Sequence, residues 1–529
     1  MEALRESPRD KGGVITTSLL LVVTAALLLV WFRLTAFYRT WKMLRKVPGP
    51  TDLVPMLFVT VAHRAILRIT HRVDYNVACL QAICGIVLCF MRGRFKLFKV
   101  YLGIVPFVVV YTPESAEALL KSTTVLNKSF IYKLLNFWLG TGLLTSKRTK
   151  WRGRRKLLTP AFHFKLLDDF LPAMAEHALE LVHKLRALPP GPVDIVPFMS
   201  NLTLDIICET AMGVKIGAIQ DEGTPYVKAV KVVSGSFLAR VVRPYFWRDS
   251  IFYLTETGRE IKKNVEFLHK FTTEIIHARK KEYMQGISTI ETNYTNTIGR
   301  KRRTAFLDTL VSYHLENPAF TENGIREEVD TFMFEGHDTT AMGISFTLYL
   351  LGLHKDVQDM VVKELQSIFN DDDRLPTVED LKQMKYLECV IKESHRLYPP
   401  VPIIGRDIEE DMEFDGYMLP KGCTVNLFIY CLHRNETWFP KPEEFRPERF
   451  LPENSAARHP YAYVPFSAGS RNCIGQRFAL QEEKTAISTI LRHFSLHSPD
   501  TRETVLLIWE LVLRPVNGLR VQFTPRKCL

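Results

Sequence analysis

One cysteine of this chain stands in a setting that suits chemistry. In the stretch 466–475, Phe-Ser-Ala-Gly-Ser-Arg-Asn-Cys-Ile-Gly, Cys473 lies between two glycines and two residues after an arginine. Residues 476–484 are good helix formers without proline, so the cysteine is expected on a loop just before a helix. The positive end of that helix would favour a thiolate, and the glycines would let the backbone approach a ligand closely. The alternative is a buried structural cysteine, because free cysteine packs as a small hydrophobic residue.

The spacing Phe-x-x-Gly-x-Arg-x-Cys-x-Gly in this stretch resembles the haem-ligand signature of the cytochrome P450 family without a mismatch. The resemblance implies that Cys473 is the axial ligand of haem iron, where a thiolate donates electron density that favours O–O cleavage. It also implies that Phe466 and Gly469 belong to the haem-binding loop. The spacing by itself does not identify haem.

Residues 324–353 read as one long helix, and the middle of this helix, Glu-Gly-His-Asp-Thr-Thr at 335–340, is polar inside an apolar run. Polar groups in a buried helix need partners or a function. A kinked core helix is one interpretation, because Ser and Thr hydroxyls can bond to carbonyls of the preceding turn. An oxygen site is the other, because the hexapeptide resembles the oxygen-activation motif of the same family. That resemblance implies open space at Gly336 and a proton relay to dioxygen through Asp338 and Thr339.

Glu335 points to one branch of the family. Most members have a small residue at the matching position, whereas a glutamate resembles the fatty-acid ω-hydroxylases of family 4, in which it can esterify a haem methyl group. The resemblance implies that Glu335 binds haem b covalently, at least in part. The alternative is a carboxyl group that burial or a helix partner keeps neutral. Segments 328–340 and 459–480 are most similar to subfamily V of family 4.

Four side chains match the residues that bind the haem propionates in this family. Trp151 and Arg155 are four residues apart on one face of a predicted helix and match its Trp-x-x-x-Arg. Three further basic residues nearby leave an ordinary basic helix as the alternative. Arg406 and Arg471 match the other propionate-binding arginines, and the planar guanidinium suits a carboxylate.

Glu393 and Arg396 lie three residues apart on a predicted helix that ends at a Pro-Pro pair. As an isolated surface pair they would contribute little to stability. They match the Glu-x-x-Arg motif of the family, and Arg449 matches the arginine of its Pro-Glu-Arg-Phe segment. The resemblance implies a structural network of these three residues that supports the cysteine loop.

The N-terminal region predicts a membrane anchor. Residues 13–32 are uncharged and apolar, and about 20 residues at about 1.5 Å each span roughly 30 Å. Residues 33–50 form a basic, proline-rich hinge without an acid, so the positive-inside rule places residues 1–12 in the lumen and the body in the cytosol. A cleaved signal peptide is the alternative, but the apolar run is long and no small-x-small cleavage site follows it.

Residues 51–94 depart from the family pattern, which resumes in the predicted catalytic domain, 95–529. This atypical stretch reads either as a divergent membrane-contacting segment or as the product of unusual splicing or gene modelling. The net charge of +12 suits an anionic membrane surface or an acidic protein partner, and is also common among proteins of membrane surfaces. The basic residues are scattered, which disfavours nucleic acid. Nine cysteines without a Cys-x-x-Cys spacing indicate neither a disulfide framework nor a zinc site.

The resemblance implies a single large, mainly α domain with small β-sheets behind a transmembrane helix, with haem between the central helix and the cysteine loop. It implies NADPH- and O2-dependent ω-hydroxylation of medium-chain and polyunsaturated fatty acids on the endoplasmic reticulum membrane. NADPH–cytochrome P450 reductase, and also cytochrome b5, would supply the electrons. The alternatives are a monooxygenase of steroids, eicosanoids or xenobiotics, an isomerase that uses no reductase, and a non-catalytic haem-binding membrane protein.

Overall fold

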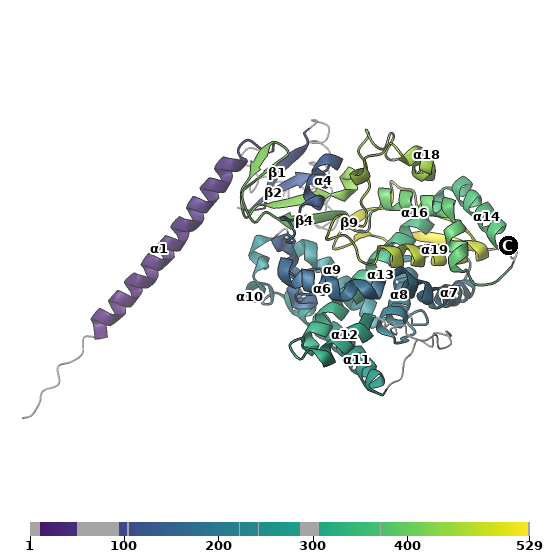
Figure 1. Cartoon of the computed structure of the whole chain (residues 1–529), viewed down its shortest axis with the longest axis horizontal. Helices are drawn as coiled ribbons and strands as arrows, with labels where there is room; N and C mark the ends of the chain where they lie inside the picture. The colour runs from purple at the N-terminus through teal and green to yellow at the C-terminus, as the bar shows by residue number, and fades with distance from the viewer. Residues whose placement is uncertain are drawn as a thin grey trace, which may run out of the picture.

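The computed structural model describes residues 11–49, 95–102, 105–221, 223–241, 243–285, 306–370 and 372–526. The body of the molecule is mainly helical with small sheets, and one long helix, α1 (Lys11–Leu44), extends away from it (Figure 1). The predicted mainly α architecture with small sheets is therefore confirmed.

Helix α13 (Glu322–Leu353) runs through the centre of the body (Figure 1). It begins at Thr321, whose hydroxyl accepts a hydrogen bond from the Gly324 N–H. Most of its side chains are buried, as expected for a helix that is apolar on nearly every face. The helices that pack against it include α8 (Val196–Ile207), α11 (Glu256–Met284), α16 (Lys385–Leu397) and α19 (Gln476–His493).

The other helices surround this core. They are α4 (Pro113–Lys121), α5 (Asn136–Leu139), α6 (Arg148–Leu158), α7 (Phe164–Arg186), α9 (Pro225–Val241), α10 (Asp249–Phe252), α12 (Phe306–Glu316), α14 (Lys355–Phe369), α15 (Val378–Gln383), α17 (Ile429–Leu432) and α18 (Pro452–Ser455). Short 3-10 turns are η1 (Phe130–Leu135), η2 (Thr159–Phe162), η4 (Pro244–Trp247), η5 (Pro447–Phe450) and η6 (Pro460–Ala462), and a π-helical turn, η3 (Cys208–Met212), follows α8.

In the part of the chain that the structure describes, the strands form four small sheets. The largest has the order β1 (Leu97–Leu102), β2 (Val105–Val110), β7 (Thr424–Phe428) and β4 (Ile403–Asp407), in which β2 and β7 are parallel with Val108 opposite Val425. A second sheet has the order β3 (Pro192–Asp194), β11 (Arg520–Pro525) and β8 (Phe494–His497). Two hairpins complete the set: β5 (Met412–Phe414) with β6 (Tyr417–Leu419), and β9 (Leu507–Trp509) with β10 (Leu513–Pro515).

Helix α1 joins the body at the sheet side. Leu44 and Val47 are buried, the Lys99 ammonium donates to the Leu44 carbonyl at 3.0 Å, and Arg39 pairs with Asp411 next to β5. Within the described residues, no helix is both long enough and apolar enough to cross a membrane. Most side chains of the predicted anchor, 13–32, and the whole stretch 51–94 lie outside the described residues.

Candidate functional site

Cys473 lies on a loop just ahead of α19, as predicted. Its N–H donates to the Phe466 carbonyl at 2.9 Å, which closes the loop around the thiol. The side chain is exposed, yet burial raises the pKa of the thiol to about 11, with the Glu335 charge as the second cause. The Cys473 side chain is surrounded by protein and yet has accessible surface, so it faces a space inside the molecule. The expectation that the protein alone favours a thiolate is wrong, because burial and the Glu335 charge raise the pKa more than the backbone hydrogen bond from Gly475 lowers it. A bound metal ion would deprotonate such a thiol.

The structure shows why position 469 needs glycine, which the sequence did not indicate. Gly469 adopts φ +70°, and a Cβ atom there would lie 1.9 Å from the Leu120 carbonyl oxygen at the end of α4. The glycine therefore lets the cysteine loop pack on α4. The predicted role, a close approach of the backbone to a ligand, is replaced by a close approach of the loop to a helix.

Glu335 of α13 faces the same internal space as Cys473. Its charge raises the pKa of the thiol, which places the carboxyl group within electrostatic reach of the sulfur. Burial raises the pKa of Glu335 itself to about 7, and the nearby Lys128 opposes this shift. Helix α13 and the cysteine loop thus form two sides of one site, as the sequence predicts.

Three cations lie close together at the internal space. Lys128, next to η1, forms a backbone bridge with Arg406 of β4, and burial followed by the charges of Arg406 and Arg471 lowers its pKa well below the usual value. Glu335 and Cys473 oppose that shift, so Lys128 lies within electrostatic reach of all four groups. Among the described residues, none of the three cations is in an ion pair with a carboxylate. A group with two carboxylates, such as haem with its propionates, fits this charge distribution.

Lys128 was not found by sequence reasoning, and no local motif marks it. It is separated from Arg406 and Arg471 by long stretches of chain and reaches them only through the fold. Arg471 donates to the Leu143 and Ser146 carbonyls, and its Nε is buried without a hydrogen-bond partner in the described part of the chain. Burial, and then Arg406, lower the pKa of Arg471 to about 9.

Trp151 and Arg155 of α6 contact residues of the cysteine loop. The Arg471 guanidinium stacks on the Trp151 ring at 4.4 Å, and Trp151 is buried. Arg155 donates to both the backbone carbonyl and the Oδ1 of Asn472, each at 2.7 Å. The structure thus brings both predicted residues to the site, where Arg155 holds the residue before Cys473.

Two polar side chains in the middle of α13 have different partners. The Thr339 hydroxyl donates to the Glu335 carbonyl at 2.6 Å, whereas the Asp338 carboxylate pairs with Arg514 of β10. Gly336 does not serve to open space, because a Cβ atom there would lie 2.8 Å from the Ile207 side chain of α8. The two members of the predicted relay are adjacent in sequence, but Asp338 turns toward the C-terminal hairpin.

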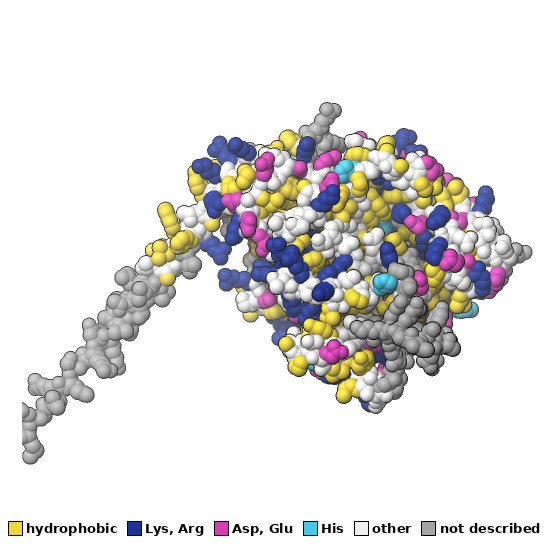
Figure 2. Space-filling model, in the orientation of Figure 1, with side chains coloured by type: hydrophobic (Ala, Val, Ile, Leu, Met, Phe, Trp, Pro, Cys, Tyr) yellow, Lys and Arg dark blue, Asp and Glu magenta, His cyan; other side chains and the backbone are white. Residues whose placement is uncertain are grey.

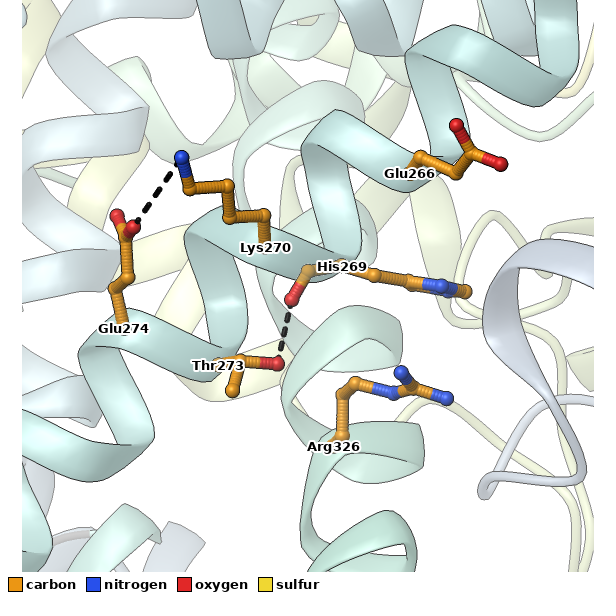
Figure 3. A pocket seen from close by; sticks show the side chains of 6 residues that line it. All are labelled: Glu266, His269, Lys270, Thr273, Glu274 and Arg326. Carbon is orange, nitrogen blue, oxygen red and sulfur yellow. Dashed lines mark hydrogen bonds and ion pairs between the residues drawn. The ribbon is translucent and has the colours of Figure 1, made fainter.

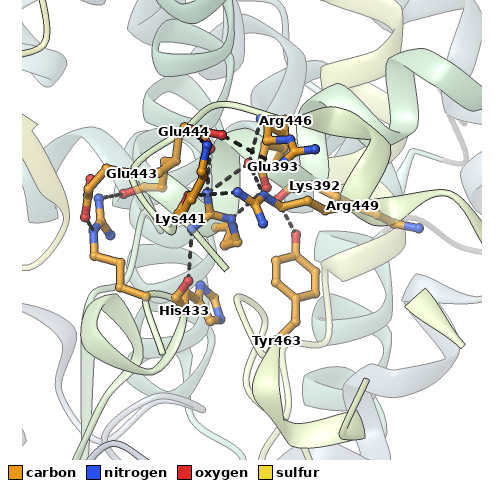
Figure 4. Close-up of polar contacts among 12 residues, drawn as sticks. Lys392, Glu393, His433, Lys441, Glu443, Glu444, Arg446, Arg449 and Tyr463 are labelled. Atoms are coloured by element: carbon orange, nitrogen blue, oxygen red, sulfur yellow. Dashed lines mark hydrogen bonds and ion pairs between the residues drawn. The ribbon is translucent and has the colours of Figure 1, made fainter. Parts of the chain in front are cut away.

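Glu393 and Arg396 of α16 form a buried pair, as the family resemblance implies and the spacing alone does not. Figure 4 shows Glu393 among its polar neighbours. Arg396 donates to both carboxylate oxygens, at 2.7 and 2.9 Å, and both side chains are fully buried. The Arg449 Nε lies 3.3 Å from the Glu393 Oε1, and the Arg446 N–H donates to the same oxygen at 2.8 Å. The three predicted residues therefore form one network.

This network reaches the cysteine loop through His433. Arg396 donates to the His433 carbonyl at 3.1 Å, and the His433 Nε2 accepts the Val464 N–H at 2.9 Å. Burial lowers the pKa of His433 well below its usual range, so the ring is neutral and can accept. Val464 lies just before the loop that carries Cys473, which gives the network a physical route to the thiol.

A separate open pocket lies on the surface of α11 and α13 (Figure 3). Its lining is mostly charged. Lys270 lies 3.9 Å from Glu274 within the lining, and the His269 Nε2 lies 2.7 Å from the carbonyl oxygen of Trp138 outside it. None of the predicted site residues lines it; the lining residues are Glu266, His269, Lys270, Thr273, Glu274 and Arg326. This pocket is therefore distinct from the thiol site.

Comparisons with known proteins agree with these observations. The family model "Cytochrome P450" matches residues 87–523. The chain is 44% identical over 496 residues to cytochrome P450 4V2 of Homo sapiens, covering 93% of this chain and 92% of that protein. It is 43% identical over 501 residues to cytochrome P450 4c3 of Drosophila melanogaster, covering 92% and 91%. It is 41% identical over 439 residues to cytochrome P450 4d2 of the same species, covering 82% and 87%.

Proposed function

This chain belongs to the cytochrome P450 family and is a family 4 monooxygenase that uses haem iron, and we propose that it hydroxylates fatty acids at their terminal carbon. The observation that carries the proposal is the Glu335 carboxyl group on α13, which faces the Cys473 thiol across the internal space. A primary C–H bond is stronger than its secondary neighbours, so terminal attack needs a site that excludes the inner carbons. A haem fixed by an ester would keep such a site rigid.

The residues that would hold haem come from four parts of the fold. Cys473 would be the axial ligand, and Lys128, Arg406 and Arg471 would bind the two propionates. Arg155 would position the loop rather than bind a propionate, since its two donors bond to Asn472. Bound haem would supply the oxygen chemistry that places one oxygen atom of O2 in a C–H bond and releases the other as water. The Asp338 carboxylate would deliver protons toward that chemistry.

Electrons would come from NADPH through NADPH–cytochrome P450 reductase, with cytochrome b5 as a second donor. An exposed basic surface on and just before α6 supports an acidic partner: Lys147, Lys150, Arg152 and Lys156. The same helix reaches the cysteine loop through Arg155 and Asn472. A partner bound there would lie close to the thiol side of the site.

The protein would be anchored in the endoplasmic reticulum membrane through residues 13–32, with the catalytic body in the cytosol. Exposed apolar side chains on α1 support this proposal, and Figure 2 shows hydrophobic side chains on the part of the helix nearer the body. Trp31 and Phe32 are 65% and 68% exposed. Exposed apolar side chains of this size need a lipid or protein environment. Dark blue Lys and Arg side chains gather where the helix meets the body, as expected near an anionic surface (Figure 2).

The function is tested by mapping the products of the full chain in membranes with the reductase, NADPH and a medium-chain saturated fatty acid. Mainly terminal hydroxylation is expected, and the same membranes without NADPH are the control. Hydroxyl groups scattered over the inner carbons would contradict terminal attack. A good haem spectrum without any product from fatty acids would move the search to steroids, eicosanoids or xenobiotics.

Covalent haem attachment is predicted to depend on Glu335. Acid extraction with organic solvent is expected to leave part of the haem on the wild-type protein and to release all of it from Glu335→Ala, because only the wild type has a carboxyl group at this place. Glu322→Ala is the matched control, since Glu322 lies in the exposed first turn of the same helix. Complete release of unmodified haem from the wild type would show that no ester forms.

A further inference from the structure

Three charged side chains form a buried triad between the C-terminal hairpin and the central helix. Arg514 of β10 pairs through its Nη2 with Asp338 of α13, and its Nε lies 3.1 Å from the Oε2 of Glu510, in the turn between β9 and β10. The Asp338 side chain is 2% exposed and that of Glu510 is 13% exposed. Glu510 is therefore the outer member of the triad and Asp338 the inner one.

The triad has an excess of one negative charge when both carboxyl groups are ionised. Burial opposes such an uncompensated charge, so one proton is favoured on the pair of carboxyl groups. Burial raises the pKa of Glu510 to about 7; Asp338 adds to this shift, whereas Arg514 and Lys231 of α9 oppose it. Arg514 remains charged throughout, because a guanidinium does not lose its proton in proteins. Near neutral pH the triad thus holds a proton that can leave.

The inner carboxyl group of the triad, that of Asp338, has an oxygen that is free to bind water. The Asp338 Oδ2 is buried without a hydrogen-bond partner in the part of the chain that the structure describes, whereas the Glu510 Oε2 faces the Arg514 Nε. Buried polar atoms of this kind are usually satisfied by ordered water. Helix α9 approaches Glu510 closely at Gly235, where an added Cβ atom would lie only 3.1 Å from the Glu510 Oε1.

We propose that Glu510 supplies protons to Asp338 during turnover, and that Arg514 is a positioning residue that holds the two carboxyl groups together. The Glu510 O–H bond breaks, the proton passes through water to the Asp338 carboxylate, and solvent returns a proton to Glu510. This inference rests on the monooxygenase reaction proposed above, in which RH, O2, two protons and two electrons give ROH and water. The electrons come from NADPH, so the triad moves protons only.

Glu510→Gln tests the proposal in the full chain with the reductase, NADPH and a saturated fatty acid. Product formed per NADPH is expected to fall roughly 10-fold to 100-fold, the lower end of what general acid catalysis contributes. Release of hydrogen peroxide is expected to rise and KM to stay unchanged. Glu503→Gln is the matched control, because Glu503 is an exposed carboxyl group of the same C-terminal segment.

The pH profile gives a readout that a structural role would not move. Wild-type kcat is expected to fall as the pH rises through about 7, because Glu510 then loses the proton that it donates. Glu510→Gln is expected to lack this decline and to be slow at every pH. Turnover supported by hydrogen peroxide brings reduced oxygen and its protons together, so its rate is expected to be the same in both proteins.

Two results would overturn the proposal. A variant with wild-type coupling and pH profile would show that Glu510 carries no proton, and a change confined to KM or to the hydroxyl position would make it a substrate contact. A wild type that forms no product would instead contradict the proposed function, before any variant is compared. Should Glu510→Gln lose the reduced CO spectrum of thiolate ligation, Glu510→Asp, which only withdraws the carboxyl group, decides the question by the same coupling ratio.

Discussion

Cys473→Ala is expected to abolish hydroxylation and to remove the shifted absorption band of reduced, CO-bound haem-thiolate. The Cys473 sulfur is the group on the loop side of the internal space, opposite Glu335 of α13, and alanine has no atom that can bind iron. Haem itself is expected to remain, with weaker affinity, because Lys128, Arg406 and Arg471 still face its propionates. The variant therefore separates iron ligation from propionate binding.

The matched control is Cys389→Ala, which removes a buried thiol far from the site in sequence. It is expected to keep both the band and the activity, because its thiol only fills space. Absorption spectra of the reduced proteins under CO, together with haem content, measure both variants. A thiolate band that persists in Cys473→Ala would show that another residue is the ligand. Loss of all haem would show that the three cations do not hold it alone.

The parts of the site that lie on short local motifs could be predicted from the sequence. The central helix was expected at 324–353 and runs from Glu322 to Leu353, because its apolar run is a local signal. The loop before α19 and the pair Glu393 and Arg396 were found for the same reason. Each of these depends on residues a few positions apart, which periodicity and spacing describe well.

The parts that were missed depend on long-range contacts. Lys128 joins the site because η1 lies beside β4, and Arg514 reaches Asp338 because the C-terminal hairpin packs on α13. An isolated lysine or arginine carries no pattern that predicts such a partner. Gly469 was predicted to let the backbone approach a ligand, and only the fold shows that its close neighbour is the Leu120 carbonyl.

Replacing Glu393 with glutamine is the change expected to destabilise the fold most among the site's supporting residues. The Glu393 carboxylate is fully buried and accepts hydrogen bonds from the Nε and Nη2 of Arg396 and from the Arg446 N–H. Glutamine keeps the size but leaves the Arg396 guanidinium without its counter-charge, and breaking such a buried pair costs about 3–5 kcal/mol. The midpoint of urea unfolding, followed by the haem absorption and by circular dichroism, is expected to fall accordingly.

Loss of the Glu393–Arg396 pair is expected to affect the cysteine loop as well as the stability of the fold. Arg396 also donates to the His433 carbonyl, and the His433 ring accepts the Val464 N–H just before the cysteine loop, so the loop is expected to loosen with the pair. Haem loss should therefore precede unfolding of the helices in Glu393→Gln. Glu379→Gln is the control, because Glu379 and its partner Lys382 are exposed and their ion pair is screened by water. An unfolding midpoint in Glu393→Gln equal to that of this control would mean that the buried pair is not what supports the loop.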